Sequence, residues 1–327
     1  MTQQPQEKTL RNLGAATANN HFTGVPMEFV VPSGTRVVFV GDMFLEDYAG
    51  GAEATSEAII QKSPHKIFKV HSSSLTIDML EKYKDVYWIL GNYTQCDVAS
   101  LAYMIQNNIK YSVIEYDYKY CMFRSEVAHV KQTNSPCDCP LRPHGMVVEK
   151  LYSAAQHIFW MSEKQKEHFL SRMPALLFVE ESKHVVLSSV FSDETIDKLL
   201  ELRQVHEQVA GKLPIKIWAV QGSSNWIKGT QETIKWCTEK RMPVKILSNL
   251  AANDFLQELA KCDGLVFHPL DFDTCPRVVI EAKIIGCALD LNENVQHKDE
   301  PWFAGTVEDT VQYLRGRGKA FWDQIVL

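Results

Sequence analysis

The sequence predicts an α/β fold with two doubly wound parallel sheets, and three observations support this prediction. Short, continuous apolar runs recur along the chain, as strands covered on both faces require. Segments of helical periodicity lie between them, so that strand and helix alternate from residue 36 to residue 291. The chain has 327 residues, about twice the usual length of one domain.

Ten apolar runs are predicted strands, five before residue 178 and five after it. In the first half they are residues 36–41, 66–70, 85–91, 110–116 and 157–162. In the second half they are residues 184–191, 215–222, 243–248, 264–269 and 287–291. In doubly wound sheets, ligands bind at the carboxyl ends of the strands.

The predicted organisation has four parts. An N-terminal tail covers residues 1–35, a first Rossmann-like domain covers 36–178, and a second covers 184–305. The last segment, 306–327, has helical periodicity, and packing of its helices against the first domain is one arrangement that we consider. We expect the two domains to face each other across a cleft.

The composition disfavours several classes of function. The net charge is −6 and neither half is rich in basic residues, so we expect no nucleic-acid partner and no electrostatic docking to an anionic membrane. No apolar run approaches the ~20 residues of a membrane-spanning helix, although peripheral membrane contact stays open. The N-terminus lacks the apolar core of a signal peptide, and five of the eight cysteines lie in buried-looking patterns that suit reduced thiols. We therefore expect a cytoplasmic protein.

The first candidate binding motif is the strand–helix connection within residues 41–59. Gly50 and Gly51 precede a helix that begins near Ala52. Glycines allow backbone N–H groups to approach a ligand closely, and a helix N-terminus attracts phosphate. The two glycines are equally compatible with an ordinary turn between strand and helix.

The second candidate motif covers residues 267–291. A strand ends at His268-Pro269, an acidic loop follows, and Pro276 is well placed in the first turn of a helix. Glu281 lies about one and a half turns into that helix, eight residues after Asp273. A carboxylate there can accept hydrogen bonds from sugar or ribose hydroxyls, and the amides at the helix start can bind a diphosphate. Taken alone, Glu281 fits a solvated surface position better.

Both motifs resemble segments of the retaining glycosyltransferases of family 4, which have the GT-B fold. In that family a strand is followed by Pro and then by Glu or a similar residue. Seven residues later comes Glu-Ala, and a Gly precedes the last strand. Here the corresponding residues are His268-Pro269, Asp273, Glu281-Ala282 and Gly286. Residues 50–53 resemble the N-terminal glycine motif of the same family.

A third segment, residues 219–237, completes the resemblance. In the family a strand ends with Gly and a basic residue, and a later Lys-Gly precedes a helix; Gly222 and Lys228-Gly229 fit this pattern. The three matches occur in order, and the resemblance covers roughly residues 36–305.

The resemblance implies a role for each matched residue. Lys228 is expected to face the diphosphate of a nucleotide sugar and to stabilise the leaving group. Glu281 is expected to bind the ribose, and Asp273 the transferred sugar. The remaining donor-binding positions, by the same carry-over, are Gly50, Gly51, Gly222, Ser223, Thr274, Cys275 and Arg277.

This chain departs from the family pattern at three positions. Asp273 stands where Glu is usual, which shortens the side chain by one methylene. Ser223 stands where a second basic residue is usual, so we expect Arg277 or another cation to compensate, or weak donor binding. The His that often follows the fourth strand is absent from Glu115-Tyr116-Asp117, and we take Asp117 as the candidate catalytic group there.

The loop at residues 120–145 concentrates potential metal ligands. Cys121, His129, Cys137, Cys139 and His144 lie within it. A structural zinc site formed by three cysteines and one histidine is chemically reasonable. The Cys-x-Cys spacing is tighter than in zinc knuckles, so we favour loop cysteines without a metal. The same residues are also compatible with a disulfide or with free thiols that line the cleft.

The expected function is transfer of a sugar from a UDP- or GDP-sugar to a hydroxyl acceptor during glycan biosynthesis, with retention and without a catalytic metal or cofactor. Two different functions stay open. One is another enzyme activity on the same fold, such as that of a sugar-nucleotide epimerase or a phosphorylase, with Glu115, Asp117 and His268 as acid–base groups. The second is non-catalytic binding of sugar nucleotides or glycans.

Overall fold

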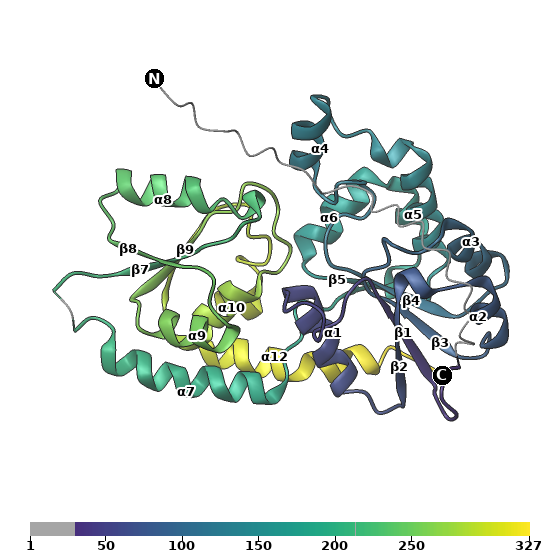
Figure 1. Cartoon of the computed structure of the whole chain (residues 1–327), viewed down its shortest axis with the longest axis horizontal. Coiled ribbons are helices and arrows are strands. Elements are labelled where there is room, and N and C mark those ends of the chain that lie inside the picture. Colours follow the sequence, from purple (N-terminus) through teal and green to yellow (C-terminus); the bar gives the residue numbers. More distant parts are fainter. Residues whose placement is uncertain (1–29, 213) are drawn as a thin grey trace, which may run out of the picture. The chain divides into compact units, whose positions relative to one another are not determined.

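The computed structural model describes residues 30–212 and 214–327 (Figure 1). The predicted tail lies outside the described residues up to residue 29. In the described part of the chain, no helix is both long enough and apolar enough to cross a membrane.

The first half contains a six-stranded parallel sheet with the order β2-β1-β3-β4-β5-β6. β1, β3, β4 and β5 are buried throughout, because helices cover both faces of the sheet, which is why the sequence shows continuous apolar runs. The strands are β1 (Val37–Gly41), β2 (Ile67–His71), β3 (Tyr87–Leu90), β4 (Tyr111–Glu115), β5 (Ile158–Trp160) and β6 (His184–Val186).

The second half contains a four-stranded parallel sheet with the order β10-β9-β7-β8. Helices lie on both sides of it, with α8 on one side and α9 on the other in Figure 1. The strands are β7 (Trp218–Gln221), β8 (Val244–Leu247), β9 (Gly264–Phe267) and β10 (Ala288–Leu291).

Helices alternate with the strands in both halves. Those of the first half are α1 (Gly51–Gln61), α2 (Ile77–Lys82), α3 (Val98–Gln106), α4 (Glu126–Thr133), α5 (Pro143–Ala154) and α6 (Glu163–Arg172). Those that follow are α7 (Asp193–Val209), α8 (Thr230–Glu239), α9 (Ala252–Ala260), α10 (Arg277–Ile285), α11 (Pro301–Ala304) and α12 (Val307–Trp322).

One predicted strand joins the sheet of the other half. The run 184–191 was expected in the second half, but its strand β6 pairs with β5, with Val185 opposite Phe159. Only a short connection separates α6 from β6, so a βαβ crossover returns the chain to the edge of the first sheet. Ser188 then adopts a left-handed conformation (φ 64°), and the chain enters α7.

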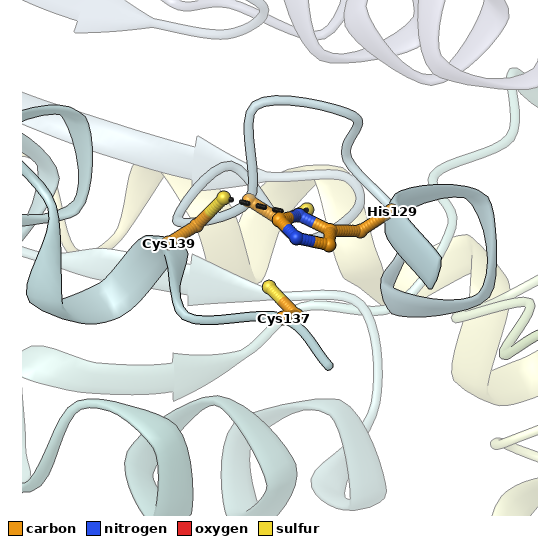
Figure 2. A group of neighbouring side chains, drawn as sticks. His129, Cys137 and Cys139 are labelled. Atoms are coloured by element: carbon orange, nitrogen blue, oxygen red, sulfur yellow. Dashed lines mark hydrogen bonds between the residues drawn. The ribbon is translucent and has the colours of Figure 1, made fainter. Parts of the chain in front are cut away.

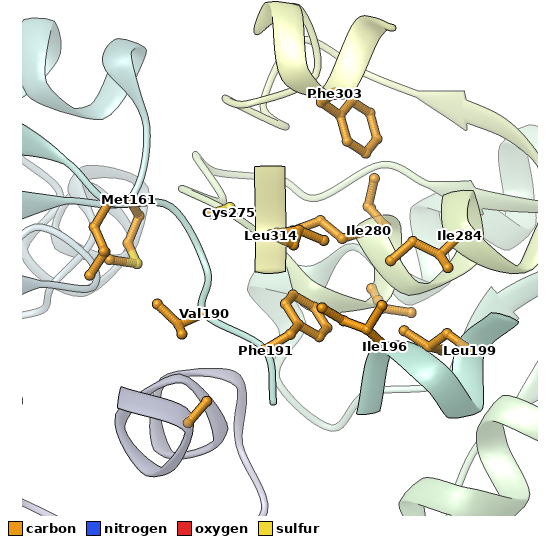
Figure 3. Packing of buried hydrophobic residues seen from close by; sticks show 14 of the residues in the cluster. Met161, Val190, Phe191, Ile196, Leu199, Cys275, Ile280, Ile284, Phe303 and Leu314 are labelled. Carbon is orange, nitrogen blue, oxygen red and sulfur yellow. The ribbon is translucent and has the colours of Figure 1, made fainter. Parts of the chain in front are cut away.

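The C-terminal helix α12 contacts both halves. Its Leu314 belongs to a buried cluster with Ile196 of α7 and Ile280 of α10 (Figure 3). Its last turn reaches the first half, where the Trp322 Nε1–H donates to the Ile59 carbonyl at 2.9 Å. The ring of Phe321 lies 4.4 Å from that of Phe159 in β5, centroid to centroid.

Two glycines of α12 provide a test of this packing. Alanine favours a helix over glycine by about 1 kcal/mol. A Cβ on Gly316 would have no heavy atom within 4 Å, so Gly316→Ala should raise the free energy of unfolding by about 0.5–1 kcal/mol. A Cβ on Gly318 would lie 2.3 Å from Cδ of Lys62, so Gly318→Ala should be destabilising. Urea unfolding measures both effects, and equal stabilisation by the two substitutions would contradict the packing of α12 on α1.

Candidate active site

The loop between β9 and α10 is anchored on both sides of Asp273. The Asp273 N–H donates to the Asn294 carbonyl at 2.8 Å, and the Asp273 carbonyl accepts from the Gln296 N–H at 3.1 Å. Its side chain is thereby directed to Lys228, whose Nζ lies 2.5 Å from Asp273 Oδ2. The structure therefore joins two of the predicted site residues in an ion pair.

The backbone around Lys228 requires glycine at two positions. Gly229 follows Lys228 in a left-handed conformation (φ 66°), and a Cβ there would lie 2.3 Å from the His268 carbonyl oxygen. A Cβ on Gly222 would lie 2.4 Å from Cβ of Ser248. The Ser223 N–H donates to the Thr230 hydroxyl at 3.1 Å. The approach of Gly229 to His268 and the Leu270 N–H, which donates to the Ile227 carbonyl at 2.7 Å, hold Lys228 beside the β9–α10 loop.

Helix α10 begins without a side-chain cap. Its N-cap is Pro276, which has no polar side-chain atom, so no N-cap side chain occupies the first-turn amides, although the Val279 N–H donates to the Pro276 carbonyl at 3.1 Å. Just before it, the Thr274 hydroxyl donates to the Tyr116 carbonyl at 2.8 Å, and the Cys275 carbonyl accepts from the Ser189 hydroxyl at 2.9 Å. These contacts fix the segment that leads into the helix.

Glu281 is a largely buried carboxylate one and a half turns into α10. Burial raises its pKa, and the Arg277 guanidinium, with Nε 3.8 Å from Glu281 Oε1, partly opposes this rise. The solvated surface position considered for Glu281 is therefore wrong, because only 16% of its side chain is exposed.

Arg277 is held by contacts within the protein. Its guanidinium lies 3.6 Å from the centroid of the Phe191 ring, and Nη1 donates to the Val190 carbonyl at 2.6 Å. A Cβ on Gly51 would lie 3.6 Å from Cδ of Arg277, so the start of α1 and the start of α10 are neighbours. Arg277 thus has protein partners in the unliganded structure, although it was expected to compensate for Ser223.

A carboxylate occupies the vicinity of Gly50-Gly51. A Cβ on Gly50 would lie 2.2 Å from Glu53 Oε2, so the side chain of Glu53 bends back toward the start of α1. Burial raises the pKa of Glu53, and Arg124 opposes this while Asp42 adds to it. The expectation that Gly50 and Gly51 bind phosphate stays a prediction, and the Glu53 carboxyl group lies where such a ligand would approach Gly50.

The carboxyl ends of β1, β3 and β4 bring further charged groups together. Asp117 forms an ion pair with Arg124, whose Nη2 also donates to Asn92 Oδ1 at 2.8 Å. Burial opposes ionisation of Asp117, but Lys119 and Arg124 lower its pKa overall. Asp117 is therefore a carboxylate at neutral pH, suited to accept hydrogen bonds or to face positive charge.

Two contacts connect α4 with the β9–α10 loop. The Ser125 hydroxyl, which caps α4, donates to Asp271 Oδ2, and the Val127 N–H donates to the same oxygen at 3.4 Å. Asp271 precedes Asp273 by two residues, so the chain segment carrying Arg124 is tied to the segment carrying Asp273. The candidate site therefore combines Asp117 and Arg124 of the first half with Lys228, Asp273 and Glu281 of the second.

The sequence alone did not single out Ser125 or Asp271, and it offered Arg124 only as one of two loop arginines, with Arg142, that could meet a charged acceptor. The signal for Ser125 was its position as a helix N-cap followed by Glu126. Asp271 could have been noticed because it lies in the same acidic loop as Asp273. The pairing of Arg124 with Asp117 has no comparable signal, because it depends on the path of a loop.

Two cavities lie near these groups. One of about 290 Å³ is lined mainly by apolar side chains, with Tyr93, Lys119 and His144 at its wall. The second, of about 470 Å³, lies between α4 and Trp226. Lys131 Nζ lies 3.6 Å from the centroid of the Trp226 ring, so this tryptophan contacts the first half.

The loop cysteines gather at one point. One ligand atom from each of Cys121, His129, Cys137 and Cys139 lies within 4.8 Å of each of the remaining three. All eight cysteines lie in the described residues and are free thiols, so the considered disulfide is absent. His144 is outside this group, and its Nε2 lies 2.7 Å from the Lys119 carbonyl oxygen.

Comparison with known proteins identifies the fold. No protein-family model matches the sequence, and no curated protein matches it. Among solved structures, sucrose-phosphate synthase from Thermosynechococcus elongatus is 12% identical, with 89% of this chain and 94% of that chain covered and a TM-score of 0.51. A trehalose-6-phosphate structure from E. coli bound with UDP-2-fluoro glucose is 10% identical, with 88% and 95% covered and a TM-score of 0.52.

A third likeness is the catalytic domain of starch synthase IV from Arabidopsis thaliana, bound to ADP and acarbose. It is 9% identical, with 88% of this chain and 95% of that chain covered and a TM-score of 0.50. At these identities the likeness concerns the fold. The predicted GT-B architecture is confirmed: this chain has two parallel sheets with interleaved helices, arranged as in GT-B glycosyltransferases.

Replacing Glu281 by glutamine should reveal the buried carboxylate through the pH dependence of stability. Because the folded-state pKa of Glu281 is raised, the folded state binds the proton more tightly, and its ionisation lowers the free energy of unfolding above the ordinary pKa of about 4.3. Glu281→Gln removes this loss. The free energy of unfolding of the variant minus that of the parent should therefore rise with pH and level off above the raised pKa. Urea unfolding across this range measures it, and a difference independent of pH would contradict the burial.

Proposed function

We propose that this chain is a glycosyltransferase that moves a sugar from a nucleotide sugar to a hydroxyl acceptor, with retention of configuration and without a catalytic metal. We further propose that it works as the family 4 enzymes it resembles do, with the donor held mainly by the second half. The observation that carries the proposal is the Lys228–Asp273 ion pair in the loop just before α10, a helix that begins without a side-chain cap and carries the largely buried Glu281.

The start of α10 suits a diphosphate for two reasons. The first-turn amides and the helix dipole favour negative charge there, and no side chain of the N-cap competes. Lys228 lies beside the preceding loop and carries a positive charge, with a third of its side chain exposed. Negative charge that develops on the leaving group during transfer would be stabilised by both.

Donor binding would exchange partners at Lys228. In the unliganded structure Asp273 neutralises Lys228. A diphosphate can take over Lys228, which frees the Asp273 carboxylate to accept hydrogen bonds from hydroxyls of the transferred sugar. Glu281, deeper in α10, would accept hydrogen bonds from the two ribose hydroxyls. Lys228 would thus be paired with Asp273 when the donor is absent and with the diphosphate when it is bound.

The bonds and the proton of the transfer step can be accounted for without a metal ion. The acceptor oxygen attacks the anomeric carbon from the face that the diphosphate leaves, and the carbon–oxygen bond to the diphosphate breaks with its electron pair on the phosphate oxygen. That oxygen then takes the acceptor proton. Asp117, ionised and paired with Arg124, would stabilise positive charge on the sugar ring rather than donate a proton.

The apolar cavity of about 290 Å³ in the first half is the place we propose for part of the acceptor. It lies beside Lys119, which is ion-paired with Glu115 at 2.9 Å. Its wall is formed largely by residues of α3 and α5, so an acceptor that enters it would have an apolar portion.

One observation favours a non-catalytic nucleotide-sugar-binding protein as the second candidate. Ser223 replaces a basic residue of the resemblance, and Arg277 is engaged by Val190 and Phe191. An epimerase is less favoured, because its proposed acid–base groups already have partners. Glu115 pairs with Lys119, Asp117 with Arg124, and His268 with Asp290 at 2.8 Å.

Nucleoside diphosphates should raise the melting temperature of the parent protein. A ligand at ten times its Kd stabilises the folded state by about 1.4 kcal/mol, or a few °C in a chain of this size. We expect one of UDP, GDP and ADP to do this in magnesium-free buffer. Lys228→Ala and Glu281→Ala should weaken binding about 10- to 100-fold, because each removes a hydrogen bond to or from a charged group. Differential scanning fluorimetry measures the shifts.

Lys235→Ala and Glu232→Ala are the matched controls for this experiment. Both residues are exposed on α8, in the same half of the chain. Their variants should respond to the nucleotide as the parent does. If the nucleotide still raises the melting temperature of both Lys228→Ala and Glu281→Ala as it does that of the parent, the ligand binds elsewhere. That result would contradict the proposed donor site.

With the nucleotide sugar identified, transfer to water or to an added acceptor should proceed without added divalent cations and give a product of the donor's anomeric configuration. Proton NMR of the anomeric signals during turnover measures this. Asp117→Asn should lower kcat more than it raises KM, because the charge of Asp117 is needed in the transition state. A product of inverted configuration would contradict the retaining mechanism, and tight donor binding without turnover would favour the non-catalytic candidate.

A further inference from the structure

Four buried side chains with soft ligand atoms converge beside α4. Cys121 lies in the turns after β4, His129 lies within α4, Cys137 lies in the loop after it, and Cys139 begins a short 3₁₀ helix (Cys139–Leu141). Figure 2 shows His129, Cys137 and Cys139 directed at one another. None of the four is more than 9% exposed.

The spacing of the ligand atoms matches a tetrahedron around one ion. With metal–sulfur bonds of about 2.3 Å and metal–nitrogen bonds of about 2.0–2.1 Å, neighbouring ligands of tetrahedral zinc are about 3.5–3.8 Å apart. Here His129 Nδ1 lies 3.3 Å from Cys139 Sγ and 3.8 Å from Cys121 Sγ. All four atoms lie within 4.8 Å of one another, so small side-chain adjustments complete the tetrahedron.

We propose that Cys121, His129, Cys137 and Cys139 bind one structural zinc ion. Three thiolates and one imidazole form one of the ligand sets that tetrahedral zinc uses in structural sites, and the set contains no oxygen ligand of the kind that magnesium and calcium require. All four positions are filled by protein, which leaves no open position for a substrate or a reactive water.

Contacts around the four ligands hold them in place. The Ser125 hydroxyl accepts the Ala128 N–H at 2.9 Å and so caps the helix that carries His129. The Phe123 ring lies edge-on to the His129 ring, with centroids 5.4 Å apart. Such outer contacts orient metal ligands before the ion binds.

A nearby arginine lies against the loop that carries the ligands, with its charge shared with Glu126. Three thiolates and one Zn²⁺ carry a net charge of −1 (3 × −1 + 2), and this charge would be buried. Arg172 of α6 donates from Nη2 to the Cys137 carbonyl at 2.6 Å. Its guanidinium also pairs with Glu126 in the first turn of α4. The positive group therefore lies against the same loop as the ligands.

The ion would order a segment that reaches the candidate active site. Residues 116–142 connect β4 with α5, and within this segment one ligand precedes α4, one lies in it and two follow it. Arg124, which pairs with Asp117, and Ser125, which contacts Asp271, lie between the first ligand and the second. Zinc would thus fix the position of α4 without taking part in chemistry, so this inference stands apart from the proposed function.

Metal analysis of the untagged protein, without a polyhistidine tag that could bind metal itself, tests the proposal. Inductively coupled plasma mass spectrometry after purification without added metal should find about one zinc per chain, since one closed four-ligand site binds one ion. Cys137→Ser and Cys139→Ser should each lower this to below about one tenth, because loss of one thiolate opens the site. Cys96→Ser is the matched control, because Cys96 lies outside the cluster, and it should keep the full zinc content.

Cobalt substitution tests the same site in the parent protein, so the conclusion does not depend on the folding of the variants. Co²⁺ exchanged for zinc should give the intense visible d–d bands of tetrahedral coordination and a thiolate-to-cobalt charge-transfer band. Protein that is metal-free as purified and gives no such bands would overturn the proposal. So would a thiol titration of the unfolded, unreduced chain that finds six free thiols instead of eight, because two of the ligands would then form a disulfide.

Discussion

A parallel strand covered by helices on both faces can place polar groups against water or a ligand only at its ends. Both sheets of this chain obey that constraint. Asp42 and Asp117 follow β1 and β4, and the β9–α10 loop with Asp273 follows β9. The apolar runs therefore do more than build the core. They direct the charged side chains of each half to the carboxyl ends of the strands, where the starts of α1 and α10 also lie.

The charges gathered there are already compensated by one another. Lys228 pairs with Asp273, Arg124 with Asp117, and Arg277 lies beside Glu281. Unpaired charges in such a partly buried place would be costly, so we propose that a charged ligand binds by exchange of partners. The α4 segment joins this arrangement through Ser125 and Asp271, and the proposed zinc ion would fix α4 further.

Periodicity predicted the ten strands and the start of α10, because buried runs and a helix-initiating proline are local signals. It could not predict that β6 joins the first sheet, since an apolar run does not say which edge accepts it. Lys228 and Asp273 were matched only through the family resemblance. The Arg124–Asp117 pair and the cysteine cluster depend on the path of a loop. The Cys-x-Cys spacing argued against a metal, but the loop that follows the end of α4 at Thr133 brings Cys139 to His129.

The central claim is that the donor is held at the start of α10. The most direct test is a crystal structure of the chain with the nucleoside diphosphate or nucleotide sugar that it binds. We expect the ribose hydroxyls at hydrogen-bonding distance from Glu281, the diphosphate at the first-turn amides of α10, and Lys228 moved from Asp273 to a phosphate oxygen. A nucleotide bound elsewhere, with the Lys228–Asp273 pair intact, would contradict the claim.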